Sequence, residues 1–165
     1  MSNKRISAVA AMAVLGALSA AHASELSLSY QGFASGAVAG NIFGPEPGAS
    51  RAVLAGQFLF DVEADPANVY PDDQLLAFCI DVTQALVTSG TTQFELIEAS
   101  SSPLLDDSQL ASIAWLYDNK AGELGNALND AAFQLALWEL RYDDSPLSLV
   151  AGPDAETFWA SSFEG

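Results

Sequence analysis

The chain has 165 residues, half of them hydrophobic, and carries 21 acidic against five basic side chains, a formal net charge of −16 at pH 7. This charge excludes nucleic acid as a partner, because binding to phosphates requires a surface of the opposite sign.

Residues 1–23 show the three-part pattern of a cleavable secretory signal peptide. Two basic residues precede an apolar run over residues 6–20, and Ala21-His22-Ala23 provides an A-x-A cleavage site. The run is shorter than the roughly 20 residues that a membrane-spanning helix needs. We therefore expect an exported protein, secreted or at the cell surface, with Ser24 as its first mature residue and no stable membrane span.

Residues 24–165 have the size of one domain, and we expect a single one. Their three basic and 21 acidic residues give this part a net charge of −18, which favours dispersal outside the cell. The acidic pairs Asp72-Asp73, Asp106-Asp107 and Asp143-Asp144 lack the D-x-[DN]-x-[DN]-G pattern of a calcium loop. No metal site and no cofactor are predicted.

The first part of this domain predicts antiparallel strands. Alternating or β-favouring residues indicate strands at Leu26 to Tyr30, Ala52 to Val62, Leu75 to Val82 and Thr91 to Glu98. The turn signal Ser89-Gly90 makes the last two the arms of a hairpin. Gly32 to Ser50 is rich in Gly, Ala and Pro, which predicts a loop or an irregular edge.

Two helices follow the strands. After Ser108, a possible N-cap, apolar residues recur at helical spacing up to Tyr117. A second helix is expected from about Asn129, also a possible cap, to Tyr142, and its nearly continuous apolar residues place it centrally. Strands followed by helices predict an α+β fold, with an antiparallel sheet, sandwich or barrel and a small helical part.

Cys79 and Gln134 conflict with the apolar segments that carry them. A buried primary amide must be hydrogen-bonded, and exported proteins usually hold cysteines in even numbers. Gln134 can pair with backbone while Cys79 is an inert buried thiol, or Cys79 can form an intermolecular disulfide. The third possibility is that the Cys79 sulfur attacks the Gln134 carboxamide and expels ammonia, leaving an internal thioester.

The surrounding residues resemble a known family. Phe78-Cys79-Ile80-Asp81, followed by Phe133-Gln134-Leu135-Ala136-Leu137-Trp138-Glu139, is similar to the cysteine and glutamine motif pair of bacterial thioester domains. These domains occur in surface adhesins, and similar motif pairs occur in exported proteins with an exosortase sorting tail. The resemblance covers about residues 75–142.

The resemblance implies a crosslink between Cys79 and Gln134, with Phe78, Asp81, Ala136 and Trp138 as motif positions. Trp138 stands four residues after Gln134 on the same helical face and could shield the bond from water. The implied function is covalent adhesion to an amine-bearing surface ligand: a protein lysine, a polyamine or an amino sugar. No Pro-Glu-Pro signal, apolar tail and basic cap precede Gly165, so a released protein or a longer chain is expected.

Other function classes fit less well. Residues 24–165 contain no histidine and no G-x-S-x-G elbow, which disfavours a hydrolase, and we expect no enzyme. The alternative is a noncovalent extracellular matrix or carbohydrate-binding module with an inert Cys79. It would use exposed aromatic residues such as Tyr30, Tyr70 or Trp159.

Overall fold

The computed structural model describes residues 24–44, 48–66, 70, 72–143 and 158–163. The strands are β1 (Ser24–Phe33), β2 (Val38–Gly44), β3 (Gly48–Ala55), β4 (Phe58–Ala64), β5 (Gln74–Ala77), β6 (Thr91–Leu96) and β7 (Trp159–Ser161), and the α-helices are α1 (Asp107–Lys120) and α2 (Ala127–Tyr142). The signal peptide predicted at residues 1–23 lies outside the described residues. None of the described helices is long and apolar enough to cross a bilayer.

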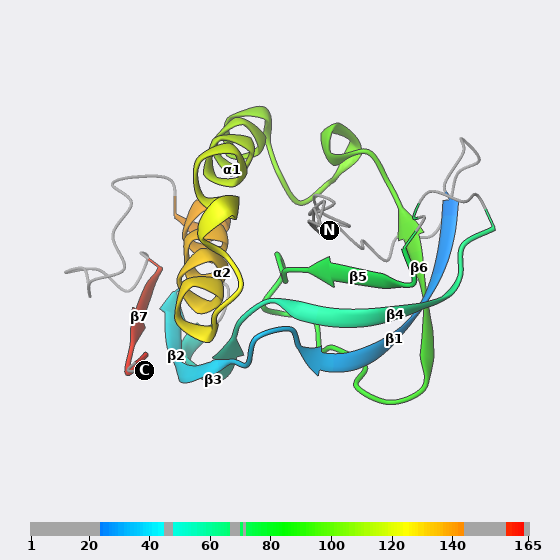
Figure 1. Cartoon of the computed structure of the whole chain (residues 1–165). Helices are drawn as coiled ribbons and strands as arrows, with labels where there is room; N and C mark the ends of the chain where they lie inside the picture. Colours follow the sequence, from blue (N-terminus) through cyan, green and yellow to red (C-terminus); the bar gives the residue numbers. More distant parts are fainter. Residues whose placement is uncertain (1–23, 45–47, 67–69, 71, 144–157, 164–165) are drawn as a thin grey trace.

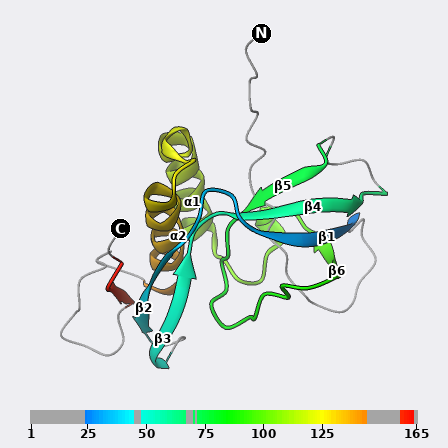
Figure 2. The same ribbon diagram turned by 60° about the horizontal axis from the view of Figure 1, so that its bottom comes forward.

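The strands form two antiparallel sheets (Figure 1). The four-stranded sheet has the order β5-β4-β1-β6, and the three-stranded sheet has the order β3-β2-β7. The helices lie beside the three-stranded sheet, and the four-stranded sheet extends away from them (Figure 2). The predicted α+β fold is confirmed. Neither sheet closes on itself, so the barrel, one of the predicted alternatives, is wrong.

The four-stranded sheet corrects the predicted hairpin. β6 pairs with β1, where Leu26 lies opposite Phe94, and β5 pairs with β4. The turn signal at Ser89-Gly90 is local, whereas the pairing of β6 follows the burial of its apolar side chains with those of β1. Leu26 and Leu28 are buried on one face of β1, as the alternation predicted, and they anchor one of two cores.

The three-stranded sheet contains the largest error of the sequence prediction. Most of the region from Gly32 to Ser50 that was expected to be loop forms β2 and the start of β3. Its small residues serve close packing: a Cβ on Gly40 would lie 2.5 Å from the Phe163 ring. Glycine in this strand marks the approach of another segment and does not mark a turn.

The predicted strand from Ala52 to Val62 is two strands that belong to different sheets. β3 ends at Ala55, and β4 begins at Phe58 in the other sheet. Gly56 lies at the break, where an added Cβ would come 2.8 Å from the Gly36 carbonyl oxygen. Because the chain passes directly from β3 into β4 at this point, the two sheets lie next to each other.

Both helices begin earlier than predicted because other residues cap them. Asp106 caps α1: its side chain accepts from the Gln109 N–H at 2.8 Å, and the Gln109 side chain accepts from the Asp106 N–H at 3.1 Å. Asn126 caps α2 by accepting from the Asn129 N–H at 3.0 Å. Ser108 and Asn129 are therefore not the caps, although both helices end near the predicted residues.

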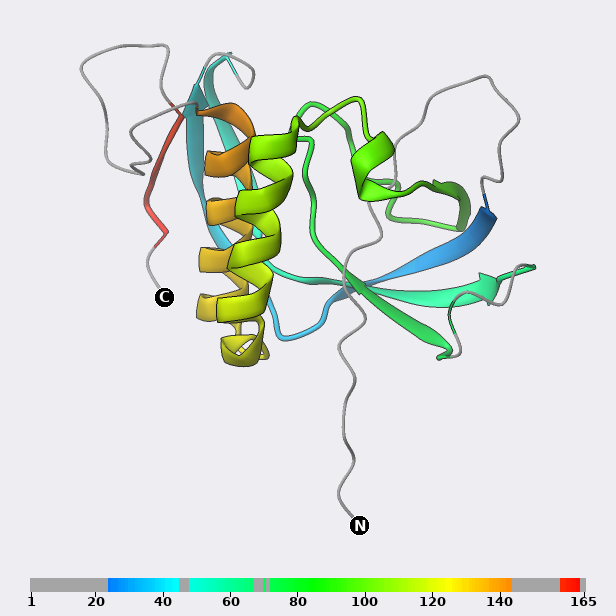
Figure 3. The ribbon, with the colours of Figure 1, turned by 90° about the horizontal axis from the view of Figure 1, so that it is seen from above.

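α2 packs between α1 and the three-stranded sheet, as the view from above shows (Figure 3). Its buried residues Ala131, Leu135 and Trp138 join residues of β2 and β3 in the second core, which Phe158 closes. The central position that its apolar sequence predicted is confirmed, since eight of its residues are buried.

Candidate functional site

Cys79 lies just beyond a strand. The predicted strand from Leu75 to Val82 is wrong in its second half, because β5 ends at Ala77 and the chain then bends. The Asp81 carboxylate accepts from the Thr83 N–H at 2.8 Å and from the Thr83 hydroxyl at 2.6 Å. This side-chain-to-backbone turn replaces ladder hydrogen bonds with local ones and ends the strand.

Gln134 lies in the middle of α2, is 1% exposed, and is paired with the Cys79 backbone. The Cys79 N–H donates to Gln134 Oε1 at 2.9 Å, and Gln134 Nε2 donates to the Cys79 carbonyl oxygen at 2.6 Å. The structure thus brings together the two residues that the sequence singled out, although 55 positions separate them.

These two hydrogen bonds bear on both interpretations of Gln134. They satisfy the buried amide through backbone groups, which is the pairing expected of the unreactive alternative. They also hold the carboxamide carbon beside the residue that carries the thiol. An N–H directed at the carbonyl oxygen stabilises the negative charge that develops there when a nucleophile attacks the carbon.

The Cys79 thiol donates to the Asp81 carbonyl oxygen at 3.2 Å. Burial raises the pKa of the Cys79 thiol, and the negative charge of Asp81 raises it further. Interactions of the sulfur with the Asp81 backbone and with the Trp138 indole lower the pKa, but their effect is smaller than that of burial. The side chain is therefore held in its protonated thiol form. A thiol is a much weaker nucleophile than a thiolate, so Cys79 is unreactive in this state.

The raised pKa gives a test of the Cys79 environment. In Gln134→Ala, which can form no thioester, alkylation of Cys79 by iodoacetamide should be slower at pH 7 than alkylation of a cysteine peptide. The rate should rise with pH through a midpoint above that of the peptide, about 8.5, because only the thiolate reacts. Asp81→Asn in the same background should lower the midpoint. A midpoint below the peptide value would contradict the burial of this thiol.

The Asp81 carboxylate itself stays ionised. Burial raises the pKa of Asp81, but hydrogen bonds from Thr83 and Tyr142 and the charge of Arg141 outweigh that effect, so the pKa is lowered overall. The ionised Asp81 carboxylate therefore accepts the hydrogen bonds that fix the loop carrying Cys79.

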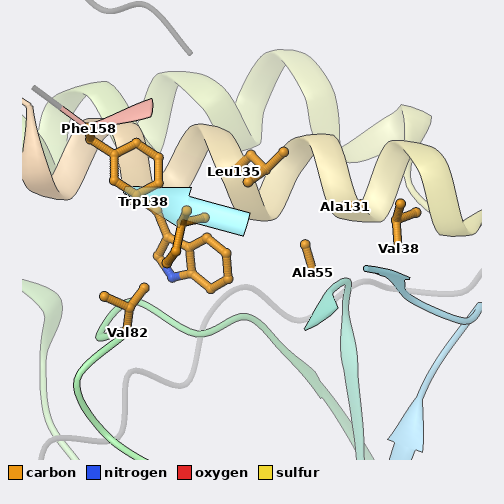
Figure 4. Packing of buried hydrophobic residues seen from close by; sticks show 8 residues of the cluster. Val38, Ala55, Val82, Ala131, Leu135, Trp138 and Phe158 are labelled. Carbon is orange, nitrogen blue, oxygen red and sulfur yellow. The ribbon is translucent and has the colours of Figure 1, made fainter. Parts of the chain in front are cut away.

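Trp138 is buried next to Cys79. It is 4% exposed, and its ring extends from α2 toward Val82 (Figure 4). Its indole N–H has no hydrogen-bond partner among the described residues, yet it is close enough to the Cys79 sulfur to lower the thiol pKa. A buried N–H group without an oxygen acceptor is energetically costly.

Three residues that the sequence analysis did not single out hold the Cys79 loop. The Tyr142 hydroxyl accepts from the Val82 N–H at 3.1 Å and donates to the Asp81 carboxylate at 3.3 Å. The Arg51 guanidinium donates to the Val82 carbonyl oxygen, and Thr83 closes the turn. Tyr142 follows Trp138 by four residues, so the spacing along the helix was a usable signal, whereas Arg51 offered none.

The remaining motif residues pack against other parts of the fold. Phe78 packs on Phe133 with ring centroids 4.8 Å apart, and Tyr117 of α1 meets Phe133 edge-on at 4.9 Å. Ala136 lies three residues after Phe133, so the two residues share a side of α2. These contacts connect the segment after β5 to both helices.

The aromatic residues expected to bind a ligand noncovalently are not fully exposed. Tyr30 packs edge-on against Phe58 and Phe60, and Trp159 stacks on Phe43 at 3.7 Å. Tyr70 is half-buried against the core of the four-stranded sheet. Trp115 on α1, which is 61% exposed, is the exposed large aromatic among the described residues.

Within the described ranges, no group of three or more His, Cys, Asp or Glu side chains is placed to hold a metal ion. No family model, curated protein or solved structure matches the chain.

Proposed function

We propose that this chain is an exported adhesion protein in which Cys79 and Gln134 form an internal thioester that couples to an amine on a partner surface. The observation that carries the proposal is the double hydrogen bond between the Gln134 carboxamide and the Cys79 backbone. It supports the proposal because it sets the electrophilic carbon beside the only cysteine of the chain. The resemblance of the two motifs adds to this support.

The formation step uses groups that already lie together. The Cys79 sulfur turns from the Asp81 carbonyl oxygen and attacks the Gln134 carboxamide carbon, while the Cys79 N–H holds the carbonyl oxygen. The carbon–nitrogen bond breaks, and the nitrogen leaves as ammonia with the thiol proton. The Cys79 carbonyl oxygen, which accepts from Nε2, faces the departing nitrogen.

Burial keeps such a bond from water. Gln134 and Trp138 are almost fully buried, so the acyl carbon is shielded until an amine reaches it. The amine nitrogen then forms an amide with the Gln134 side chain, and the sulfur leaves as the Cys79 thiol. The partner stays attached to α2 by a bond that survives denaturation.

Intact mass spectrometry tests the proposal. The mature protein should be lighter than its sequence mass by one ammonia, and methylamine should add one amine and release one titratable thiol. The deficit should vanish in Cys79→Ala and in Gln134→Ala. Gln93→Ala, which removes an exposed glutamine on β6, is the matched control and should keep the deficit. A full sequence mass together with a freely titrating Cys79 would contradict the thioester, and the noncovalent binding module would remain as the function.

A further inference from the structure

A cavity of about 140 Å³ opens between the four-stranded sheet and the segment of residues 78–87. Apolar side chains from β1, β4, β5 and β6 line it on the side of the sheet, among them Leu28, Phe60 and Phe94. Leu86 and Val87 line it on the side of the segment. Thirteen of its seventeen lining residues are aliphatic or aromatic, so an uncharged apolar group is the occupant that this lining favours.

The cavity reaches the cysteine of the candidate thioester. Cys79 lines it and also packs against the core that α2 forms with the three-stranded sheet, so this residue stands between the two. The Gln134 carboxamide is hydrogen-bonded to the Cys79 backbone. Asp81 is the charged residue among those that line the cavity, and its negative sign attracts an ammonium group toward the same end.

The size and the apolar lining of the cavity favour some classes of amine over others. A cavity of about 150 Å³ lined by apolar side chains accommodates benzene, so this one suits a group of about six carbons. The hydroxyl groups of an amino sugar, or the second ammonium group of a polyamine, would lose water there without gaining partners. The lining therefore discriminates among amines that a bare thioester would treat alike.

We propose that this cavity, which we call the Cys79 pocket, selects the nucleophile: a primary amine attached to an uncharged apolar group of about six carbons. The inference rests on the proposed thioester and adds its substrate class. The apolar group occupies the Cys79 pocket while the nitrogen attacks the acyl carbon. The nitrogen loses one proton, the carbon–sulfur bond breaks, and the sulfur leaves as a thiol with one proton.

Amines of matched length test this inference. Thiol release should be measured for methylamine, hexylamine and 1,6-diaminohexane at equal concentrations of free amino groups. Hexylamine should react about tenfold faster than methylamine or more, because each buried methylene favours binding. It should also react faster than 1,6-diaminohexane, which differs only in its second charge. Equal rates for all three amines would overturn the inference and leave the thioester standing.

Two substitutions in the Cys79 pocket and one control on α1 locate the selectivity. Ala85→Phe, at an exposed position that lines the Cys79 pocket, should reduce the ratio of the hexylamine rate to the methylamine rate toward one. Ala111→Phe, at an exposed position on α1, should keep the ratio. Val87→Asp should favour 1,6-diaminohexane over hexylamine, since it adds a carboxylate to the lining. Ratios insensitive to Ala85→Phe and Val87→Asp would place the selectivity elsewhere, and no thiol release with any amine would contradict the thioester and this inference together.

Discussion

Cys79→Ala is expected to lower the free energy of unfolding by about 4 kcal/mol, on the order of 15 °C in melting temperature. A crosslink between residues 79 and 134 closes a loop of 55 positions, and the chain-entropy model of a covalent crosslink gives this magnitude for a loop of that length. The substituted protein retains the whole Gln134 carboxamide and can form both of its hydrogen bonds with residue 79, because they use only the backbone of that residue. Urea unfolding of the two proteins measures the difference.

Two comparisons separate the crosslink from side-chain packing. Gln134→Ala should be less stable than Cys79→Ala by a further 1 to 3 kcal/mol or so, because the Cys79 N–H and carbonyl groups then lose their partners. Methylamine treatment should destabilise the wild-type protein and leave Cys79→Ala unchanged. A loss of only about 1 kcal/mol in Cys79→Ala, the usual cost of a single substitution, would indicate an inert thiol.

Phe158→Ala should destabilise the fold by about 3 to 5 kcal/mol. Phe158 is fully buried among Ile42, Trp138 and the other residues of the core between α2 and the three-stranded sheet. Its ring also stacks on Tyr142 with centroids 6.2 Å apart, so a cavity there would loosen the residue that holds Val82 and Asp81. The midpoint of urea unfolding measures the loss.

Leu54→Ala is the control for Phe158→Ala, since Leu54 on β3 is 56% exposed and its truncation should change stability by less than about 0.5 kcal/mol. If Phe158→Ala were as mild as Leu54→Ala, the segment that carries Phe158 would not belong to the core in solution.

The helices were the most predictable part of the fold. Their apolar spacing and high helix propensity are local properties, so α2 was placed within two residues and its central position followed from its lack of a polar face. The caps were less predictable, because Asp106 and Ser108, or Asn126 and Asn129, offer equivalent side chains within one turn. The choice between them depends on which side chain reaches a free N–H.

The three-stranded sheet could not be predicted from local pattern. Gly40 is required by the Phe163 ring, which comes from a distant part of the chain, so its reason for being small is not visible nearby. The pairing of β6 with β1 is likewise a long-range choice, and a turn signal predicts only neighbouring pairs.

The candidate site was predictable in its pair of residues and not in its surroundings. Cys79 and Gln134 stood out because each contradicts an apolar segment, and the structure pairs them. The turn around Asp81 and the contact from Arg51 depend on where the strand ends, which the sequence placed five residues too late. Strand ends are weakly encoded wherever apolar residues continue past them.

The pairing of β2 with β7 sets the order of events during folding. Asn41 lies opposite Ser161, so the three-stranded sheet and the Phe158 contacts form only after the other described strands and helices have been synthesised. Until then the core between α2 and the three-stranded sheet is incomplete, and Cys79 and Gln134 are not yet shielded from water. In the proposed function, the thioester therefore forms late. A chain that is kept unfolded for translocation carries no thioester, and the bond forms only after export and folding.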